Sequence, residues 1–275
     1  MGDHATLSPP RPERLRWLET PPSLRQEPDD LRARLEAIVT RGATTQVYVA
    51  HRRSVYRAED PVLGPIAIKE VRNPSPARQL WYACFAEHSG VREYRLGLAF
   101  AARGGRTLTS LGAALERSPV GLARVLLFTS WLQDAVTLTR WLAERAAPPD
   151  PRLLATLASQ IAAAARLGLV HHRHSSNNLL VVTQQGEPLL YTIDFPHATL
   201  GAGLDTAGLA VDAARIARWI LLEKLWTRAN VQEFFQAVAD AVRDETPLGD
   251  DLPARMAREL EAVIRDPSAR PPVSA

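Results

Sequence analysis

The stretch Leu169–Pro196 decides the fold of this chain. It reads Leu-Val-His-His-Arg-His-Ser-Ser-Asn-Asn-Leu-Leu-Val-Val over 169–182, and after a turn at Gly186 it ends in Leu-Leu-Tyr-Thr-Ile-Asp-Phe-Pro over 189–196. A polar cluster is therefore followed by a hydrophobic strand, a turn and a second hydrophobic strand that ends at Asp194. This order predicts a β-hairpin with polar, chemically active side chains at one end.

The composition of the 275-residue chain indicates a globular, soluble protein. Hydrophobic residues make up 46% and charged residues 23%, and no apolar run approaches the roughly 18 residues that span a bilayer. The Pro-rich, charged N-terminus lacks the apolar segment of a secretory signal. The single cysteine, Cys84, permits no internal disulfide and suits a reducing cytoplasm, and its expected role is that of a small buried residue. The net charge of +3 is compatible with phosphate-bearing ligands or an anionic membrane surface, although an ordinary solvated surface is the simpler explanation.

The first half of the chain predicts an arm followed by a small β-rich lobe. Residues 1–28 contain six prolines and predict an extended arm, which Trp17 and Leu18 are candidates to anchor. A short helix is expected from Asp29 to Gly42. Alternating patterns then predict three antiparallel strands over 46–49, 54–58 and 65–71, and a helix is predicted over 77–103. A buried strand over 125–132 closes this N-terminal lobe, which we assign to residues 29–130.

The second half, residues 131–275, predicts a mainly helical lobe. An Ala-rich helix is expected over 150–167, before the central stretch. An amphipathic helix begins near Asp212, and two more are expected over about 231–244 and 253–265.

These motifs, in this order, resemble those of protein kinases, aminoglycoside phosphotransferases and lipopolysaccharide-core kinases. The strand that ends in Ile-Ala-Ile-Lys at Lys69 resembles the V-A-I-K strand of kinases. The segment Arg-Glu-Tyr-Arg over 92–95 resembles the helix that supplies a glutamate to that lysine, and Glu93 fits better than Glu87. Asp194 with Phe195 resembles D-F-G, with proline in place of glycine. The closing Asp-Pro-Ser-Ala-Arg-Pro over 266–271 resembles the D-P-x-x-R-P end of protein kinases.

The resemblance implies a bilobal protein-kinase-like α+β fold that binds ATP and Mg²⁺. Such enzymes accelerate phosphoryl transfer mainly by positioning the reactants and neutralising the charge on the phosphates. Asp212 corresponds to the carboxylate that supports the catalytic loop from below. The other implied site residues are Lys69 and Glu93 at the phosphates, Arg52 and Arg53 in a glycine-free phosphate turn, Ser130 at the adenine hinge, and Asn178 and Asp194 at the metal.

One position departs from the kinase pattern. Five residues before Asn178, where kinases carry the catalytic aspartate, this chain has Arg173, and no carboxylate lies between Gly168 and Gly186. Three interpretations follow: a nucleotide-binding protein that has lost phosphoryl transfer, because arginine accepts no proton; a loop in which His174 orients the acceptor hydroxyl; or a loop whose histidines are structural. A zinc site made of His171, His172 and His174 is the weakest alternative, because their spacing does not aim them at one point.

The branch that the sequence resembles most is the lipopolysaccharide-core (Kdo/heptose) kinase family. Only about seventeen residues separate Asp194 from Asp212, and the A-P-E element of protein kinases is missing. The resemblance covers residues 45–225. It implies a nucleotide-dependent phosphotransferase that acts on a sugar hydroxyl of a glycolipid, in the cytoplasm and at the inner membrane face, with no nucleic-acid partner. The alternative is a pseudokinase that serves as a nucleotide-binding or scaffolding module.

Overall fold

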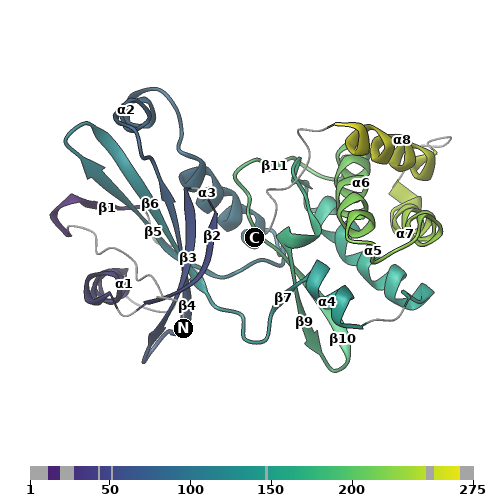
Figure 1. Ribbon diagram of the computed structural model, residues 1–275, viewed down its shortest axis with the longest axis horizontal. Coiled ribbons are helices and arrows are strands. Elements are labelled where there is room, and N and C mark those ends of the chain that lie inside the picture. The colour runs from purple at the N-terminus through teal and green to yellow at the C-terminus, as the bar shows by residue number, and fades with distance from the viewer. Residues whose placement is uncertain are drawn as a thin grey trace. The chain divides into compact units, whose positions relative to one another are not determined.

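The protein, described here by a computed structural model, contains two compact units that are considered separately. Unit 1 comprises the residues up to Leu98 together with Leu108–Leu132, and unit 2 comprises Ala99–Thr107 and the residues from Gln133 onward. Unit 1 is built on a large sheet, and unit 2 is mainly helical (Figure 1). The predicted α+β class is therefore confirmed. The structure describes residues 12–18, 28–42, 44–50, 52–145, 148–245 and 251–266.

The sheet of unit 1 has six antiparallel strands in the order β1-β5-β6-β4-β3-β2. The strands predicted over residues 46–71 and before Ser130 are confirmed. The sequence does not predict β5, because its residues Leu111–Ala114 are all buried and give no polar alternation. The six strands are β1 (Leu15–Trp17), β2 (Thr44–Ala50), β3 (Arg53–Asp60), β4 (Gly64–Arg72), β5 (Ser110–Ser118) and β6 (Gly121–Ser130).

Each face of this sheet is covered by its own helix. The alternation of β4 places Ile66 and Ile68 on one face, where they pack in one cluster with Leu31 and Leu35 of α1 (Pro28–Arg41). The opposite face packs against Val91 and other residues of α3 (Ser89–Ala102). Because neighbouring strand residues point to opposite faces, Lys69 lies on the side that α3 covers.

The helix predicted over 77–103 is wrong as one element. The chain forms α2 (Pro76–Cys84) and α3, because the residues after Phe85 leave the helical path and His88 starts a new helix. The Nδ1 atom of His88 accepts the N–H of Gly90 at 3.1 Å, and its carbonyl accepts the N–H of Arg92 at 3.0 Å. The bond from Gly90 satisfies an N–H group that the first turn of a helix leaves without an intrahelical partner, and the bond from Arg92 is the first i→i−4 bond of the helix. By contrast, the predicted end of α1 is confirmed, since Gly42 follows it with φ +65°.

The anchor predicted for the N-terminal arm is present. Most of residues 1–28 lies outside the described residues, but a 3-10 turn, η1 (Pro12–Arg14), leads into β1. Trp17 stacks on Phe128 with ring centroids 5.4 Å apart, and its Nε1–H donates to Glu36 at 2.6 Å. Leu18 donates its N–H to the carbonyl of Ala113 at 2.9 Å.

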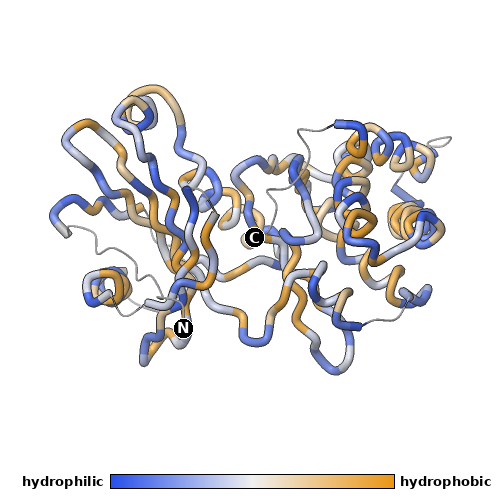
Figure 2. Tube along the Cα trace, viewed as in Figure 1, coloured by the Kyte–Doolittle hydropathy of each residue, from blue (hydrophilic) through white to orange (hydrophobic). Residues whose placement is uncertain are grey.

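Unit 2 surrounds the central stretch with helices. The hairpin of β9 and β10 is extended by β7, and β8 pairs with β11. Figure 2 shows hydrophobic residues along the helices of this unit, whose buried faces form one core. Within the described ranges, no helix is long and apolar enough to cross a membrane. The predicted D-P-x-x-R-P end lies outside these ranges beyond Asp266. The elements are β7 (Val136–Thr137), α4 (Leu138–Arg145), α5 (Pro151–Arg166), β8 (Leu169–Val170), η2 (Ser176–Asn178), β9 (Leu179–Gln184), β10 (Glu187–Thr192), β11 (Thr199–Leu200), α6 (Thr206–Leu222), α7 (Arg228–Ala241), η3 (Arg243–Glu245) and α8 (Leu252–Arg265).

Candidate functional site

The predicted lysine–glutamate pair is present in unit 1. The Nζ atom of Lys69 on β4 donates to both carboxylate oxygens of Glu93 on α3, at 2.7 and 2.9 Å. The side chains are 19% and 12% exposed, so the ion pair is shielded but open to a ligand. Glu87, the rejected alternative, pairs with Arg95 instead. A flexible lysine stem is thereby held in one direction, which a phosphate-binding lysine requires.

The strand that carries Lys69 is fixed from the other face of the sheet. Glu70 is fully buried, and its carboxylate is bound by Arg124 of β6 at 2.5 Å and by Arg72 at 2.8 Å. Arg124 also bonds Glu116 of β5. This network ties β4 to its neighbours, so the position of Lys69 rests on a cross-strand set of ion pairs.

The predicted phosphate turn lies at the end of the sheet near Lys69. Arg52 accepts the N–H of Arg72 on its carbonyl at 2.9 Å, and Arg53 begins β3. Burial lowers the pKa of His88 to about 4, and the charges of Arg52 and Arg53 add to the shift. Both arginines therefore place positive charge at this end of unit 1. His51 of the same turn lies outside the described residues.

Ser130, the predicted hinge residue, ends β6. Its N–H donates to the carbonyl of Thr109 at 2.8 Å, and its Oγ accepts the N–H of Thr109 at 3.1 Å. The N–H of the next residue, Trp131, donates to Pro65 at 3.0 Å. Ser130 is thus held rigidly in unit 1, and its hydroxyl has a structural partner.

In unit 2, a buried aspartate supports the loop that follows β8. The carboxylate of Asp212 on α6 accepts the N–H of His171 at 2.6 Å and the N–H of His172 at 3.1 Å. Burial raises the pKa of Asp212 to about 7, although these two N–H groups oppose the shift. Asp212 therefore occupies the supporting position that its place in the sequence predicts.

The base of the same loop is fixed by a close backbone approach. Gly168 has φ +86°, and a Cβ atom there would lie 2.2 Å from the carbonyl oxygen of Gly201, so only glycine fits. Arg103 donates to the carbonyl of Leu167 at 2.8 Å and also to that of Gly201. This arginine thereby links the start of β8 to the end of β11, at one end of the β8–β11 pair.

Arg173 and Asn178 occupy the two ends of the predicted catalytic turn. Arg173 is exposed, and its N–H donates to the carbonyl of His171 at 2.7 Å. The amide of Asn178 donates to the carbonyl of Arg173 at 3.3 Å. This hydrogen bond fixes the orientation of the side-chain amide of Asn178, and with it the direction of the amide oxygen. The side chain of Arg173 stands at the position where kinases carry aspartate.

The structure argues against the acceptor contact predicted for His174. The ring is 5% exposed and stacks on His171 with centroids 4.5 Å apart and an interplanar angle of 6°. Burial lowers the pKa of His174 well below its ordinary value, and His171 adds to this. Its Nδ1 lies 3.8 Å from a carboxylate oxygen of Asp212. His174 is thus a packed interior residue, which fits the structural interpretation of the loop histidines.

Asp194 follows β10 at the same end of the hairpin as Asn178. The N–H of Ile193 donates to the carbonyl of Asn178 at 3.0 Å, which joins the two predicted metal-binding residues through their neighbours. Asp194 has φ +65°, a left-handed conformation that is uncommon for residues other than glycine but that aspartate tolerates better than most. The carboxylate of Asp194 and the amide oxygen of Asn178 are ligand types that suit Mg²⁺, and they would hold the ion together with phosphate and water oxygens.

Phe195 fixes the backbone that presents Asp194. Its buried ring packs against Phe100 at 5.8 Å and His171 at 6.1 Å. The Nε2–H of His171 donates to the carbonyl of Ile193 at 3.0 Å. The loop of His171 and the segment of Asp194 are consequently one packed assembly. No pattern in the sequence singles out Phe100.

The three loop histidines do not converge on one point. His172, with φ +59°, turns its Nε2 to the hydroxyl of Thr199 at 2.9 Å, whereas His171 and His174 stack on each other. Across the described parts of the chain, no group of three or more His, Cys, Asp or Glu side chains is placed to hold a metal ion.

The fold of these two units matches solved structures. No protein-family model matches the chain, and no curated protein matches it in sequence. The structure of WaaP, a lipopolysaccharide-core kinase, in complex with acyl carrier protein aligns with a TM-score of 0.52 and 22% identity, over 90% of this chain and 98% of that one. The chain has a protein-kinase-like fold. The kinase domain of Mycobacterium tuberculosis PknI aligns with a TM-score of 0.45 and 16% identity, over 79% of this chain and 96% of that domain.

The alignment with WaaP confirms the predicted kinase-like bilobal fold and the structural likeness to a lipopolysaccharide-core kinase. At 22% identity the similarity to WaaP concerns the fold alone. The function of the chain therefore depends on the site residues described above in unit 1 and in unit 2, and not on the fold.

Proposed function

We propose that the protein is a kinase-like phosphotransferase that uses ATP and Mg²⁺ to phosphorylate a sugar hydroxyl. The observation that carries this proposal is the ion pair of Lys69 and Glu93, in which Nζ donates to the two carboxylate oxygens at 2.7 and 2.9 Å. A lysine directed by a glutamate on a helix is the arrangement by which kinase-like enzymes hold the phosphates of ATP. Asn178 and Asp194 would hold Mg²⁺, which neutralises charge on the phosphates when it is bound.

The other predicted nucleotide contacts have unequal support. Arg52 and Arg53 supply positive charge in a turn that has no glycine, so they would bind phosphate through side chains in place of close backbone N–H groups. Ser130 has less support as an adenine contact, because its hydroxyl accepts a bond from Thr109 and its backbone N–H donates to the carbonyl of Thr109.

Arg173 sets the chemical character of the proposed transfer. It is always protonated and takes no proton from an acceptor hydroxyl, but it can stabilise the charge on the phosphoryl group in flight. Phosphoryl transfer passes through a loose transition state in which positioning and charge dominate. The lost base function costs about 10²–10⁴-fold in rate by this reasoning, so we expect slow turnover.

The acceptor we propose is a glycolipid sugar of the lipopolysaccharide-core type. The support is the short segment between Asp194 and α6, which leaves little chain for a peptide-binding platform, together with the structural likeness to WaaP. Such an acceptor would place the protein in the cytoplasm, at the inner face of the inner membrane.

A second function, a nucleotide-binding or scaffolding module without transfer activity, is favoured by two observations. Arg173 replaces the aspartate, and His174, the other residue considered for the acceptor hydroxyl, is buried against His171. The two proposals share the nucleotide site and differ only in turnover.

Label transfer from [γ-³²P]ATP to a lipopolysaccharide-core acceptor tests the first proposal. We expect Mg²⁺-dependent labelling that is lost in Asp194→Ala and in Lys69→Met. Absence of labelling, together with intact ATP binding, would overturn the phosphotransferase and support the binding module. Absence of both labelling and binding would overturn both proposals.

A further inference from the structure

Helix α2 presents most of its large apolar side chains to solvent and turns Gln79 and Tyr82 toward the rest of unit 1, where Tyr82 packs on the core. Leu80, Trp81 and Phe85, at and just after the helix, are 52%, 55% and 72% exposed. No residue of α2 is buried, and the side chains turned partly inward are Gln79 and Tyr82. A surface helix normally shows the opposite arrangement, with its apolar stripe against the core.

Polar bonds hold α2 in this orientation. The Nε2 of Gln79 donates to the carbonyl of Asn73 at 2.9 Å, and its Oε1 accepts the hydroxyl of Ser118. A Cβ atom at Gly121 would lie 2.4 Å from the carbonyl oxygen of Gln79, so the β5–β6 turn packs directly on the helix backbone. The outward position of the apolar residues is therefore built into the fold of unit 1.

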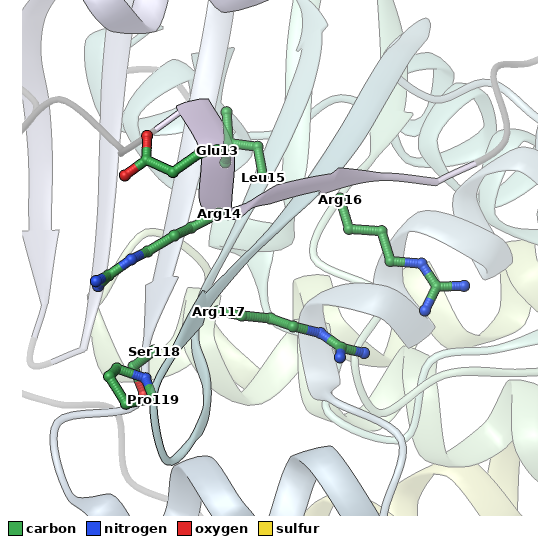
Figure 3. A pocket seen from close by; sticks show the side chains of 7 residues that line it. All are labelled: Glu13, Arg14, Leu15, Arg16, Arg117, Ser118 and Pro119. Atoms are coloured by element: carbon green, nitrogen blue, oxygen red, sulfur yellow. The ribbon is translucent and has the colours of Figure 1, made fainter.

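A basic hollow adjoins the helix at the same turn. Figure 3 shows its lining, in which the side chains of Arg16 and Arg117 extend in the same direction. Ser118, which bonds α2, is part of the lining, and the adjacent Val120 is 47% exposed. The lining contains three arginines and one carboxylate, and its residues are Glu13, Arg14, Leu15, Arg16, Arg117, Ser118 and Pro119.

We propose that this combined surface docks on an anionic lipid bilayer. We call it the α2 surface and define it by Leu80, Trp81, Phe85 and Val120, flanked by Arg14, Arg16, Arg78 and Arg117. Aromatic and aliphatic side chains enter the boundary between headgroups and acyl chains, while arginines bind the anionic headgroups. The inference rests on the proposed glycolipid function, but the residues that carry it belong to unit 1 and are different from those assigned to nucleotide binding and transfer.

Charge and shape favour a bilayer over a second copy of the chain. In a symmetric dimer the same patch contacts itself, which would bring the arginines of one copy against those of the other. The α2 helix has no acidic residue that could compensate, and in the described part of the chain the neighbouring Glu87 pairs with Arg95. A lipid surface supplies negative charge over an apolar layer, which matches both features.

The chain offers a direct probe of this contact. Cys84 lies on α2, is exposed, contrary to the buried position expected from the sequence, and is the single cysteine of the protein. With a polarity-sensitive fluorophore on Cys84, we expect a blue shift and increased emission on vesicles of phosphatidylglycerol and phosphatidylethanolamine. Phosphatidylcholine vesicles should give little change, and added salt should weaken binding.

Vesicle flotation of the unlabelled full chain tests the residues. Trp81→Ser with Phe85→Ser should weaken binding to the anionic vesicles about tenfold or more. Arg14→Gln, Arg16→Gln and Arg117→Gln together should weaken it about a hundredfold. The matched control is Tyr48→Ser with Val49→Ser on β2, because these side chains are each 54% exposed but lie outside the α2 surface; binding should not change. Thermal unfolding checks that every variant is folded.

Three results would overturn the proposal: no binding of the parent to anionic vesicles, equal binding by the Trp81/Phe85 variant, or an unshifted Cys84 label on vesicles that do bind the protein. Concentration-dependent dimers that the Trp81/Phe85 variant abolishes, without vesicle binding, would assign the surface to a second copy. ATP binding measured without lipid is independent of all these outcomes, so failure here is distinct from failure of the proposed function.

Discussion

Removal of the Asp212 carboxylate should loosen the loop that carries the candidate catalytic residues. In Asp212→Ala, the buried N–H of His171 and the partly buried N–H of His172 lose acceptors that now lie at 2.6 and 3.1 Å. A buried unsatisfied N–H costs about 1–3 kcal/mol and a partly buried one costs less, because water can reach it, so we expect a loss of about 1–4 kcal/mol in the free energy of unfolding. Asp212→Asn keeps one acceptor oxygen and should lose about half as much.

The pH dependence of this effect has a definite sign. Burial raises the pKa of Asp212 from 3.8 to about 7, so the folded state binds more protons than the unfolded state between these values. The contribution of Asp212 is fully present below about pH 4 and is lost as pH rises to about 7, by about 4 kcal/mol. His171 and His174 act in the opposite direction, because burial lowers their pKa values. These histidines are common to parent and Asp212→Asn, so the difference between the two proteins isolates the carboxylate.

Urea unfolding across pH 4 to pH 8, with hydrogen exchange at the amides of His171 and His172, measures both effects. The account is refuted if Asp212→Ala unfolds within about 0.5 kcal/mol of the parent and the two amides keep their protection. Arg95→Ala serves as a control, since the ion pair it removes is exposed and should contribute little.

The remaining predictions concern the nucleotide half-site and the position of the missing base. Lys69→Met should reduce ATP affinity or turnover about a hundredfold with little loss of stability, and calorimetric titration measures the affinity. If the losses of binding free energy in Lys69→Met and Glu93→Gln add up in the double variant, the two residues do not act as a pair. Arg173→Asp restores a carboxylate and should raise turnover about a hundredfold, measured by label transfer; an unchanged rate would show that the loop no longer places an acceptor there. Glu70→Ala removes one of the two carboxylates that bind the buried Arg124, while Glu116 remains, and should cost about 1–3 kcal/mol in urea unfolding, whereas a loss below about 0.5 kcal/mol would contradict the anchoring of β4.

The strands next to Lys69 could be predicted because each follows a simple alternation. Ile66 and Ile68 enter the core on one face, and this periodicity also directs Lys69 toward α3, where Glu93 meets it. Asn178 and Asp194 could be found by order along the chain. In the structure the N–H of Ile193, the residue before Asp194, donates to the carbonyl of Asn178, which brings the two residues to one end of the hairpin.

The elements that could not be predicted from the sequence depend on burial or on a single hydrogen bond at a helix start. Leu111–Ala114 of β5 is buried on both faces and carries no periodic signal. The break between α2 and α3 depends on the hydrogen bond from Gly90 to His88, which a helical pattern does not reveal. His174 was a candidate for the acceptor because sequence distance places it near Arg173, yet only the fold shows that its ring turns inward and stacks on His171.

The most direct test of the central claim is a thermal-shift titration with ATP, with and without Mg²⁺, on the parent and on Asp194→Ala. A kinase-like site predicts a rise in Tm that grows with ATP concentration, requires Mg²⁺ and is lost in Asp194→Ala, because a ligand that binds only the folded state stabilises it. A parent protein that shows no Mg²⁺-dependent rise in Tm would contradict the nucleotide site, and with it both the phosphotransferase and the binding module.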